Sequence, residues 1–364
     1  MYVKNLSLNS FRSYNSLYID FLPGVNVFLG NNGTGKTNVL EALYCLSAGR
    51  SFRTSEDALL VKHNLKAYKI HAEVSDNGLD KEYSIEYNAE TKRKSIKENN
   101  TKLSKMAELI GRIPVVLFSP ENIMTIKAEP QLRRKFIDEY IYQINKEHYI
   151  TSTKYAKEVA HRNYLLKLIR EKKSTQDNLS IWNEQLAENG SRIIVERLKA
   201  VKELNRILEE KLSDNMPEIK LNYISKKECV SDGSQMKKIL LDSLNQNIDE
   251  EIARATTLFG PHRDDIEILF NGVSAKNFAS EGQQRIAAIM MKLGEGLAIV
   301  EKRGSYPIVL LDDFSSELDD INRGIVGKTF LKFKQIIITT AGRDKLKGFD
   351  AVREFKVTEN GIIS

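Results

Sequence analysis

The sequence has very little cysteine and no long apolar segment. Only two of its 364 residues are cysteines, Cys45 and Cys229, and their spacing matches neither a disulfide framework nor a zinc site. The longest apolar runs, such as IVLL at 308–311, are far shorter than the roughly 20 residues that cross a bilayer. The N-terminus, MYVKNLSL, lacks the apolar core of a secretory signal. We therefore expect a cytoplasmic protein that does not enter a membrane.

The charge is only mildly unbalanced. The chain has 55 lysines and arginines against 49 acidic residues, a net charge of +6, and 41% of its residues are hydrophobic. This composition is typical of a globular protein with a substantial core, in one large or two modest domains. The small positive excess is compatible with nucleic-acid binding but does not by itself indicate it.

Glycine is almost absent from residues 121–256, where long charged stretches with helical periodicity replace it. Residues 1–120 and 257–364 instead mix strand and helix patterns, with hairpin signals at Asn77-Gly78, at Asn99-Asn100 and in DDIEILFNGVSA. We predict an α/β fold with mixed sheets, formed by 1–120 together with 257–364. A mostly helical lobe at 121–256 is expected to interrupt it.

Residues 30–37, GNNGTGKT, match the complete phosphate-loop pattern G-x-x-x-x-G-K-[ST]. An apolar strand precedes them and a helical pattern follows at 36–48, which disfavours the alternative of a chance glycine-rich turn. Amides of such a loop and the positive helix end surround phosphates. Lys36 is expected to reach the β- and γ-phosphates of ATP, and Thr37 to bind Mg²⁺. The predicted ATP-binding residues are Gly30, Asn31, Asn32, Gly33, Thr34, Gly35, Lys36 and Thr37.

A second apolar strand pattern, PIVLLDDF at 307–314, ends in two acids. We predict that Asp312 binds Mg²⁺ and that Asp313 orients or deprotonates the attacking water. Lys36 and Asp313 are then the candidate catalytic residues. The alternative is a solvated acidic turn after a strand, and the complete phosphate loop in the same chain disfavours it.

Residues 280–284, SEGQQ, begin a helix predicted over 280–302. Taken alone, this stretch indicates a serine that caps a helix N-terminus. Beside a phosphate loop and an acidic strand, it resembles the signature motif of ABC-type ATPases, and SELD at 316–319 resembles their D-loop, with Asp319. In that superfamily the signature contacts ATP bound to the partner chain. The resemblance implies a homodimer formed with ATP, in which each chain completes the other's site through Ser280, Glu281, Gly282 and Gln283.

Two branches of the superfamily are alternatives, the ATP-binding motor subunit of a membrane transporter and the DNA-repair group. Lys36 and Asp312 lie 276 positions apart, more than a compact transporter subunit is expected to have. Threonine, at Thr339 or Thr340, occupies the position where transporters usually have histidine. The opening strand also ends in NSFRSY, which resembles the element preceding the phosphate loop in the DNA-repair group. These features favour DNA repair.

GRSFRTS at 49–55, FGPHRDD at 259–265 and FASEGQQR at 278–285 resemble the bacterial RecF family, over residues 1 to about 340. The resemblance implies ATP-dependent dimerisation and DNA binding, with slow, DNA-stimulated ATP hydrolysis. It also implies action with RecR and RecO at single-strand gaps, where RecA replaces single-strand-binding protein. Asp313 is one methylene shorter than the glutamate of long-armed relatives, which favours slow chemistry. A scaffold that binds ATP without hydrolysing it is the other alternative.

The densest basic segment is KRKSIKENNTKLSK at 92–105, with six lysines or arginines and one acid in fourteen residues. Such cations bind the phosphate backbone of DNA without reading its sequence, although a solvated hairpin has the same composition. The candidate DNA-binding residues are Arg50, Arg53, Lys92, Arg93, Lys94 and Lys97.

Three residues have open roles. By resemblance, His262 and Arg263 lie near the nucleotide or the dimer interface; alternatively they form a turn in which Arg263 pairs with Asp264 or Asp265. Glu121, which follows a buried strand pattern, is a candidate for the position that ABC-type ATPases fill with glutamine after the first lobe.

Overall fold

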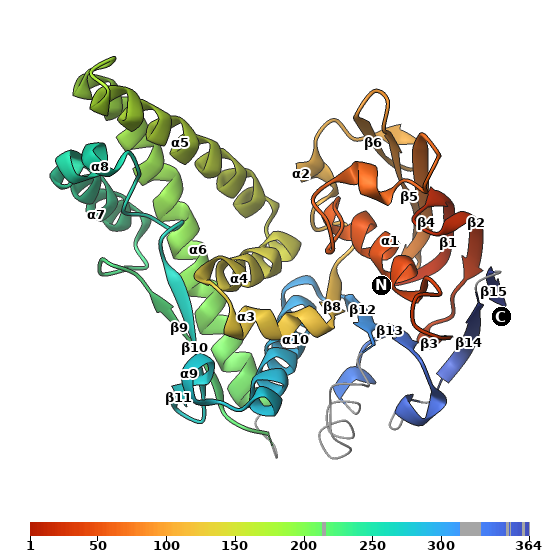
Figure 1. The fold of residues 1–364 in the computed structure, drawn as a ribbon. Coiled ribbons are helices and arrows are strands. Elements are labelled where there is room, and N and C mark those ends of the chain that lie inside the picture. The colour runs from red at the N-terminus through yellow and green to blue at the C-terminus, as the bar shows by residue number, and fades with distance from the viewer. Residues whose placement is uncertain (213–215, 314–328, 347–348, 350, 359–360, 364) are drawn as a thin grey trace. The chain divides into compact units, whose positions relative to one another are not determined.

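The computed structural model describes residues 1–212, 216–313, 329–346, 349, 351–358 and 361–363. The chain forms two compact units, Met1–Ile123 with Ala279–Ser364, and Met124–Phe278 (Figure 1). The first is an α/β unit made from two distant parts of the sequence, and the second is a mostly helical insertion. The predicted fold class, with mixed sheets and an inserted helical part, is confirmed. No helix within the described ranges is both long and apolar enough to span a membrane.

An antiparallel sheet opens the first unit, with strand order β2-β1-β4-β5-β6-β7. Two predicted hairpins are confirmed here: Asp76 pairs with Leu79 across Asn77-Gly78, and Glu98 with Thr101 across Asn99-Asn100. These turn residues adopt positive φ angles, which asparagine and glycine tolerate. The strands are β1 (Tyr2–Phe11), β2 (Tyr14–Asp20), β4 (Ala67–Asp76), β5 (Leu79–Asn88), β6 (Arg93–Glu98) and β7 (Thr101–Lys102).

A second, mostly parallel sheet has the order β15-β14-β3-β13-β12-β8. Every residue of β12 and β13 is buried, as expected for strands covered on both faces. Because β3, β12 and β13 run parallel, their carboxyl ends meet at one edge of the sheet. The strands are β3 (Gly24–Leu29), β8 (Val115–Phe118), β12 (Ile308–Asp312), β13 (Gln335–Thr340), β14 (Ala351–Thr358) and β15 (Gly361–Ile363).

Three α-helices complete the described part of the first unit: α1 (Lys36–Ala48), α2 (Met106–Leu109) and α10 (Glu281–Arg303). Helix α1 contacts β5 of the antiparallel sheet and β8, β12 and β13 of the parallel sheet. The core is therefore shared by both sheets and α1. The helices predicted at 36–48 and 280–302 are both confirmed. Short 3₁₀ helices lie at Asp57–Leu60, Pro120–Ile123 and Arg343–Leu346.

The second unit is organised around the long helix α6, which contacts α4, α5, α7 and β9. The stretch that was expected to be helical also contains strand β9. Its buried residues Ile219 and Leu221 alternate, as in a strand, and it pairs with β10. The Asn271-Gly272 hairpin is confirmed, and it extends this unit to Phe278. The elements are α3 (Met124–Lys127), α4 (Pro130–Ile144), α5 (Lys146–Arg170), the 3₁₀ helix Gln176–Leu179, α6 (Ser180–Leu212), β9 (Ile219–Ile224), α7 (Gly233–Gln246), α8 (Ile248–Arg254), β10 (Asp265–Phe270), β11 (Val273–Ser274) and α9 (Ala275–Phe278).

Candidate functional site

The predicted phosphate loop joins β3 to α1 and depends on glycine for its shape. Gly33 and Gly35 have φ angles of 84° and 100°, in the left-handed region that favours glycine. At Gly30, a Cβ atom would lie 2.2 Å from the backbone oxygen of Val357. At Gly35, a Cβ atom would lie 2.8 Å from the hydroxyl of Ser13. The glycines therefore permit the tight turn that a phosphate-binding loop requires.

Lys36 holds its ammonium group over this loop. Its Nζ atom donates hydrogen bonds to the carbonyl oxygens of Gly30, at 2.6 Å, and Asn31, at 2.7 Å. Burial lowers the pKa of Lys36, and the nearby carboxylates of Asp313 and Asp312 oppose that shift. The cation thus lies between the loop and the two acids predicted to act with it.

Asp312, at the end of β12, accepts hydrogen bonds from two other segments at this edge of the sheet. Its Oδ1 atom accepts hydrogen bonds from the hydroxyl of Thr37, at 2.8 Å, and from that of Thr339, at 2.7 Å. Burial raises the pKa of Asp312; the two hydroxyls lower it, and the carboxylates of Glu121 and Asp313 raise it further. Hydroxyl and carboxylate oxygens beside other negative groups are ligands that suit Mg²⁺. Thr37 and Asp312 therefore fit the metal site predicted for them.

Thr339 is one of the two threonines that are candidates for the position where transporters usually have histidine. Its hydroxyl donates to Asp312 and accepts the backbone N–H of Asp313, at 3.0 Å. Asp313 itself has a φ angle of 44°, a left-handed conformation that aspartate tolerates better than most residues. Asp319, assigned to the D-loop, lies outside the described residues.

Ser280 caps helix α10, and the predicted signature residues lie in its first turn. The Ser280 hydroxyl accepts the backbone N–H of Gln283, at 3.3 Å, and the Gln283 side chain accepts the backbone N–H of Ser280, at 2.8 Å. Glu281 forms an ion pair with Arg285. A Cβ atom on Gly282 would meet no described atom within 4 Å. The motif is therefore a helix cap within its own chain, with an open face at Gly282.

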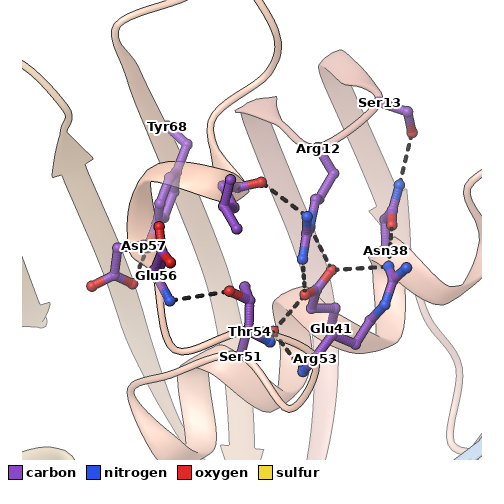
Figure 2. A network of polar contacts seen from close by, with 11 residues as sticks. Arg12, Ser13, Asn38, Glu41, Ser51, Arg53, Thr54, Glu56, Asp57 and Tyr68 are labelled. Carbon is purple, nitrogen blue, oxygen red and sulfur yellow. Dashed lines mark hydrogen bonds and ion pairs between the residues drawn. The ribbon is translucent and has the colours of Figure 1, made fainter.

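A network that the sequence analysis missed surrounds Glu41 on α1 (Figure 2). Glu41 is fully buried, yet its carboxylate accepts hydrogen bonds from Arg12 and from Ser51 and forms an ion pair with Arg53. Arg12 belongs to the NSFRSY element, and Ser51 and Arg53 to GRSFRTS. The sequence offers no local signal for this network, because an acid on a helix is usually solvated.

The basic candidates divide between the two faces of β6 because side chains alternate along a strand. Lys94 lies on the same face as buried Ile96 and donates to the Gly49 carbonyl, at 2.7 Å, and to Asp57, at 2.5 Å. Arg93 and Lys97 lie on the other face, where Lys97 is 3.8 Å from Glu86. The remaining candidates, Lys92, Arg50 and Arg53, lie in turns and loops and are exposed or partly exposed.

His262 and Arg263 both make hydrogen bonds within the second unit, His262 partly buried and Arg263 exposed. The His262 ring contacts the Tyr155 hydroxyl, at 2.8 Å, and the Thr257 carbonyl, at 3.2 Å. Arg263 donates to Thr257 and Thr256. The expected pairing of Arg263 with Asp264 or Asp265 is wrong: those acids instead accept hydrogen bonds from Tyr223 and Arg133.

Glu121 is exposed on the 3₁₀ helix that follows β8, and its charge contributes to the raised pKa of Asp312. The same helix borders a small pocket against α10 and the end of β12. Ser119, Asn122, Arg285 and Asp312 are among its lining residues. Glu121 stays a candidate for the position that ABC-type ATPases fill with glutamine.

The chain matches known proteins along almost its entire length. The family model described as the RecF/RecN/SMC N terminal domain covers residues 2–364. The DNA replication and repair protein RecF of Clostridium perfringens is 38% identical over 352 residues, 96% of this chain and 95% of its own. The same-named protein of Clostridium novyi is 36% identical over 370 residues, covering 100% of both chains.

Solved structures give the same result. A structure of the recombination mediator protein RecF with ATP, in the RecFOR pathway, has a TM-score of 0.91 and 33% identity, and the match covers 100% of this chain and 97% of that one. An SMC head bound to the C-terminal winged-helix domain of ScpA shares the fold, with a TM-score of 0.57 and 17% identity. With the phosphate loop, the acidic strand and the capped signature helix all in place, the chain belongs to the RecF family.

Proposed function

We propose that this protein is an ATP-dependent DNA-binding protein of recombinational repair, which forms a homodimer with ATP and hydrolyses it slowly. The observation that carries this proposal is the convergence of Thr37 and Thr339 on one oxygen of Asp312, beside a complete phosphate loop. Three separate strands and loops deliver these groups, which is the arrangement that a nucleotide and its metal ion need. The ATP named for the solved relative supports the same assignment.

The residues have distinct roles in the proposed reaction. Lys36 exchanges its two loop carbonyls for phosphate oxygens and stabilises the charge that develops during transfer. Thr37 and Asp312 hold Mg²⁺, which when bound neutralises phosphate charge. Asp313 orients the attacking water, while Thr339 fixes both the Asp312 carboxylate and the Asp313 backbone. The short Asp313 side chain makes this step slow, so hydrolysis acts as a switch.

The signature residues Ser280, Glu281, Gly282 and Gln283 are proposed to act on ATP held by the second copy. The N-terminus of α10 carries the positive end of a 23-residue helix, and the open face at Gly282 allows close approach of an anion. An isologous dimer formed in this way contains two composite sites. ATP is then required for assembly as well as for turnover.

The proposed DNA surface uses the cations that face outward. Arg93 and Lys97 on β6, Lys92 in the adjacent turn, and the loop after α1 with Arg50 and Arg53 supply sequence-independent phosphate contacts. Lys94 contributes least, because its ammonium group is held by Asp57 and the Gly49 carbonyl.

Pathway and partners follow from the relatives. The solved structures are described as RecF of the RecFOR pathway, so we propose RecO and RecR as partners and cytoplasmic single-strand gaps as the place of action. The relatives named above are DNA replication and repair proteins, which does not favour the transporter alternative.

Analytical ultracentrifugation tests the proposal, with and without ATP, Mg²⁺ and a short DNA duplex. The wild type is expected to become dimeric with ATP and DNA, whereas Lys36→Met and Ser280→Arg stay monomeric. If Ser280→Arg dimerises as well as the wild type does, Ser280 is only a helix cap and the dimeric mechanism is wrong.

A further inference from the structure

Glu41 joins three segments that are distant in sequence. It lies on α1, five residues after Lys36, and its side chain is 0% exposed. Contacts reach it from the β1–β2 turn, through Arg12, and from the loop after α1, through Ser51 and Arg53 (Figure 2). A buried carboxylate with this many partners holds its surroundings in one arrangement.

Every side-chain nitrogen atom of Arg12 donates a hydrogen bond in this arrangement. Its Nε and Nη2 atoms bind both oxygens of Glu41, at 2.9 and 2.6 Å, and its Nη1 atom donates to the Leu59 carbonyl, at 2.9 Å. Such a two-pronged pair is the strong form of the arginine–carboxylate contact. Three of the five N–H groups of Arg12 are therefore engaged, one on each of its nitrogen atoms.

Arg53 is held more loosely. Its side chain is 44% exposed, and only Nη1 is engaged, 3.5 Å from Glu41 and 3.2 Å from the side-chain oxygen of Asn38. Within the described ranges, Nε and Nη2 of Arg53 have no hydrogen-bond partner. Because Arg12 and Ser51 also bind Glu41, Arg53 can move to another anion without leaving a buried charge unpaired.

The contacts of Arg53 continue to the phosphate loop. Asn38, which accepts from Arg53, donates to the Ser13 hydroxyl, at 2.9 Å, and its backbone N–H binds the Gly35 carbonyl. The neighbouring Tyr14 hydroxyl donates to that same carbonyl, at 3.0 Å. A change at Arg53 therefore reaches the first turn of α1 and Gly35 through direct contacts.

We infer that Glu41 is a positioning residue that holds Arg53 against the phosphate-loop helix, and that Arg53 exchanges Asn38 and Glu41 for a backbone phosphate when DNA binds. This inference rests on the proposed function, because it assigns to these residues the coupling between DNA and ATP hydrolysis. When the Arg53 contact is lost, the Asn38 side chain keeps its hydrogen bond to Ser13, beside the loop proposed to hold ATP.

The test compares ATP turnover with and without a short DNA duplex in the wild type, Glu41→Gln and Arg53→Lys. Lysine keeps the charge of Arg53 but loses the planar fork that contacts Asn38 and Glu41 together. Arg192→Lys is the matched control, because Arg192 is an exposed arginine on α6 that also pairs with a glutamate, Glu188, and belongs to none of the proposed sites. We expect the ratio of stimulated to unstimulated kcat to fall at least about fivefold in both test variants, with KM for ATP changed less than about twofold. The control keeps the wild-type ratio.

The outcomes separate the two proposals. A wild type without any DNA stimulation contradicts the proposed function itself. A wild type that is stimulated, with folded Glu41→Gln or Arg53→Lys stimulated equally, overturns the role of Glu41 and Arg53 alone. If Glu41→Gln does not fold, Arg53→Lys decides, since Arg53 is partly exposed and its replacement leaves the Arg12–Glu41 pair intact.

Discussion

Each unit of this protein contains a fully buried glutamate paired with arginine, but the two networks differ in how completely they are closed. In the second unit, Glu251 pairs with Arg162 at 2.6 Å, and both side chains are 0% exposed. Arg162 also donates to Asn183 and Thr257 within the same interior. In the first unit, the network around Glu41 includes Arg53, which is 44% exposed.

We infer that the closed network has a structural role, whereas the network with a partly exposed arginine can exchange one of its contacts. A closed buried network fixes one conformation, and breaking it leaves a charge without a partner. A network that includes a partly exposed arginine can exchange that contact for an external anion at little cost. His262 belongs with the closed kind, because its ring contacts the Tyr155 hydroxyl and the Thr257 carbonyl inside the second unit.

The largest expected effect is that of Arg162→Met. Removing one member of a fully buried ion pair leaves Glu251 uncompensated, so we expect the free energy of unfolding to fall by about 3 to 5 kcal/mol. Urea denaturation followed by circular dichroism measures it. The double variant Arg162→Met with Glu251→Met is expected to recover much of the loss. A loss below about 1 kcal/mol for the single variant would show that this network is not closed.

A smaller effect is expected in how the free energy of unfolding depends on pH. Burial, together with the charges of Arg263, Arg134 and Arg197, lowers the pKa of His262 from 6.5 to about 4. Between these values the unfolded chain binds a proton at this residue and the native chain does not. The free energy of unfolding therefore falls as the pH drops from 6.5 towards 4, by at most about 3 kcal/mol from this residue.

Denaturation of His262→Asn at several pH values tests this expectation. The variant is less stable at pH 7, but its stability should depend less on pH below 6.5 than that of the wild type. His161→Asn is the control, because His161 is exposed on α5. Equal pH slopes for the wild type and His262→Asn would contradict a buried, neutral His262.

The smallest expected effect is that of Arg53→Ala on stability. Its contact with Glu41 is long and partly exposed, so we expect a change within about 1 kcal/mol. Arg12→Ala is the matched variant on the same carboxylate, and it should cost at least about 2 kcal/mol because Glu41 is buried. Thermal unfolding of both variants measures the contrast. Similar losses would mean that Arg53 is as tightly bound as Arg12.

Local patterns predicted much of the fold. The loop and helix at 30–48, the strand ending at Asp312 and three asparagine turns follow from short-range rules on glycine, asparagine and apolar runs. The placement of Thr37 and Asp312 at one edge follows from parallel strands. The pairing of β9 with β10 could not be predicted from local patterns, because β9 is short and lies among charged helices.

The Glu41 network could not be predicted from the sequence for a different reason. Arg12 lies 29 positions before Glu41, and nothing in the sequence near Glu41 distinguishes it from a solvated acid on a helix. The face of β6 on which each basic residue lies could have been predicted, because period-two alternation places Lys94 on the same face as Ile96. Grouping all basic residues of that segment together ignored this alternation.

The most direct test of the central claim is a mixing experiment with Lys36→Met and Ser280→Arg. Each variant alone should lack ATPase activity, because two copies of the same variant cannot form an intact composite site. In a mixed dimer, the intact phosphate loop of one chain faces the intact signature of the other, so one complete site forms. We predict that mixing the two inactive proteins restores DNA-stimulated ATP hydrolysis. If the mixture stays as inactive as its components, Ser280 does not complete the partner's site, and the proposed mechanism is wrong.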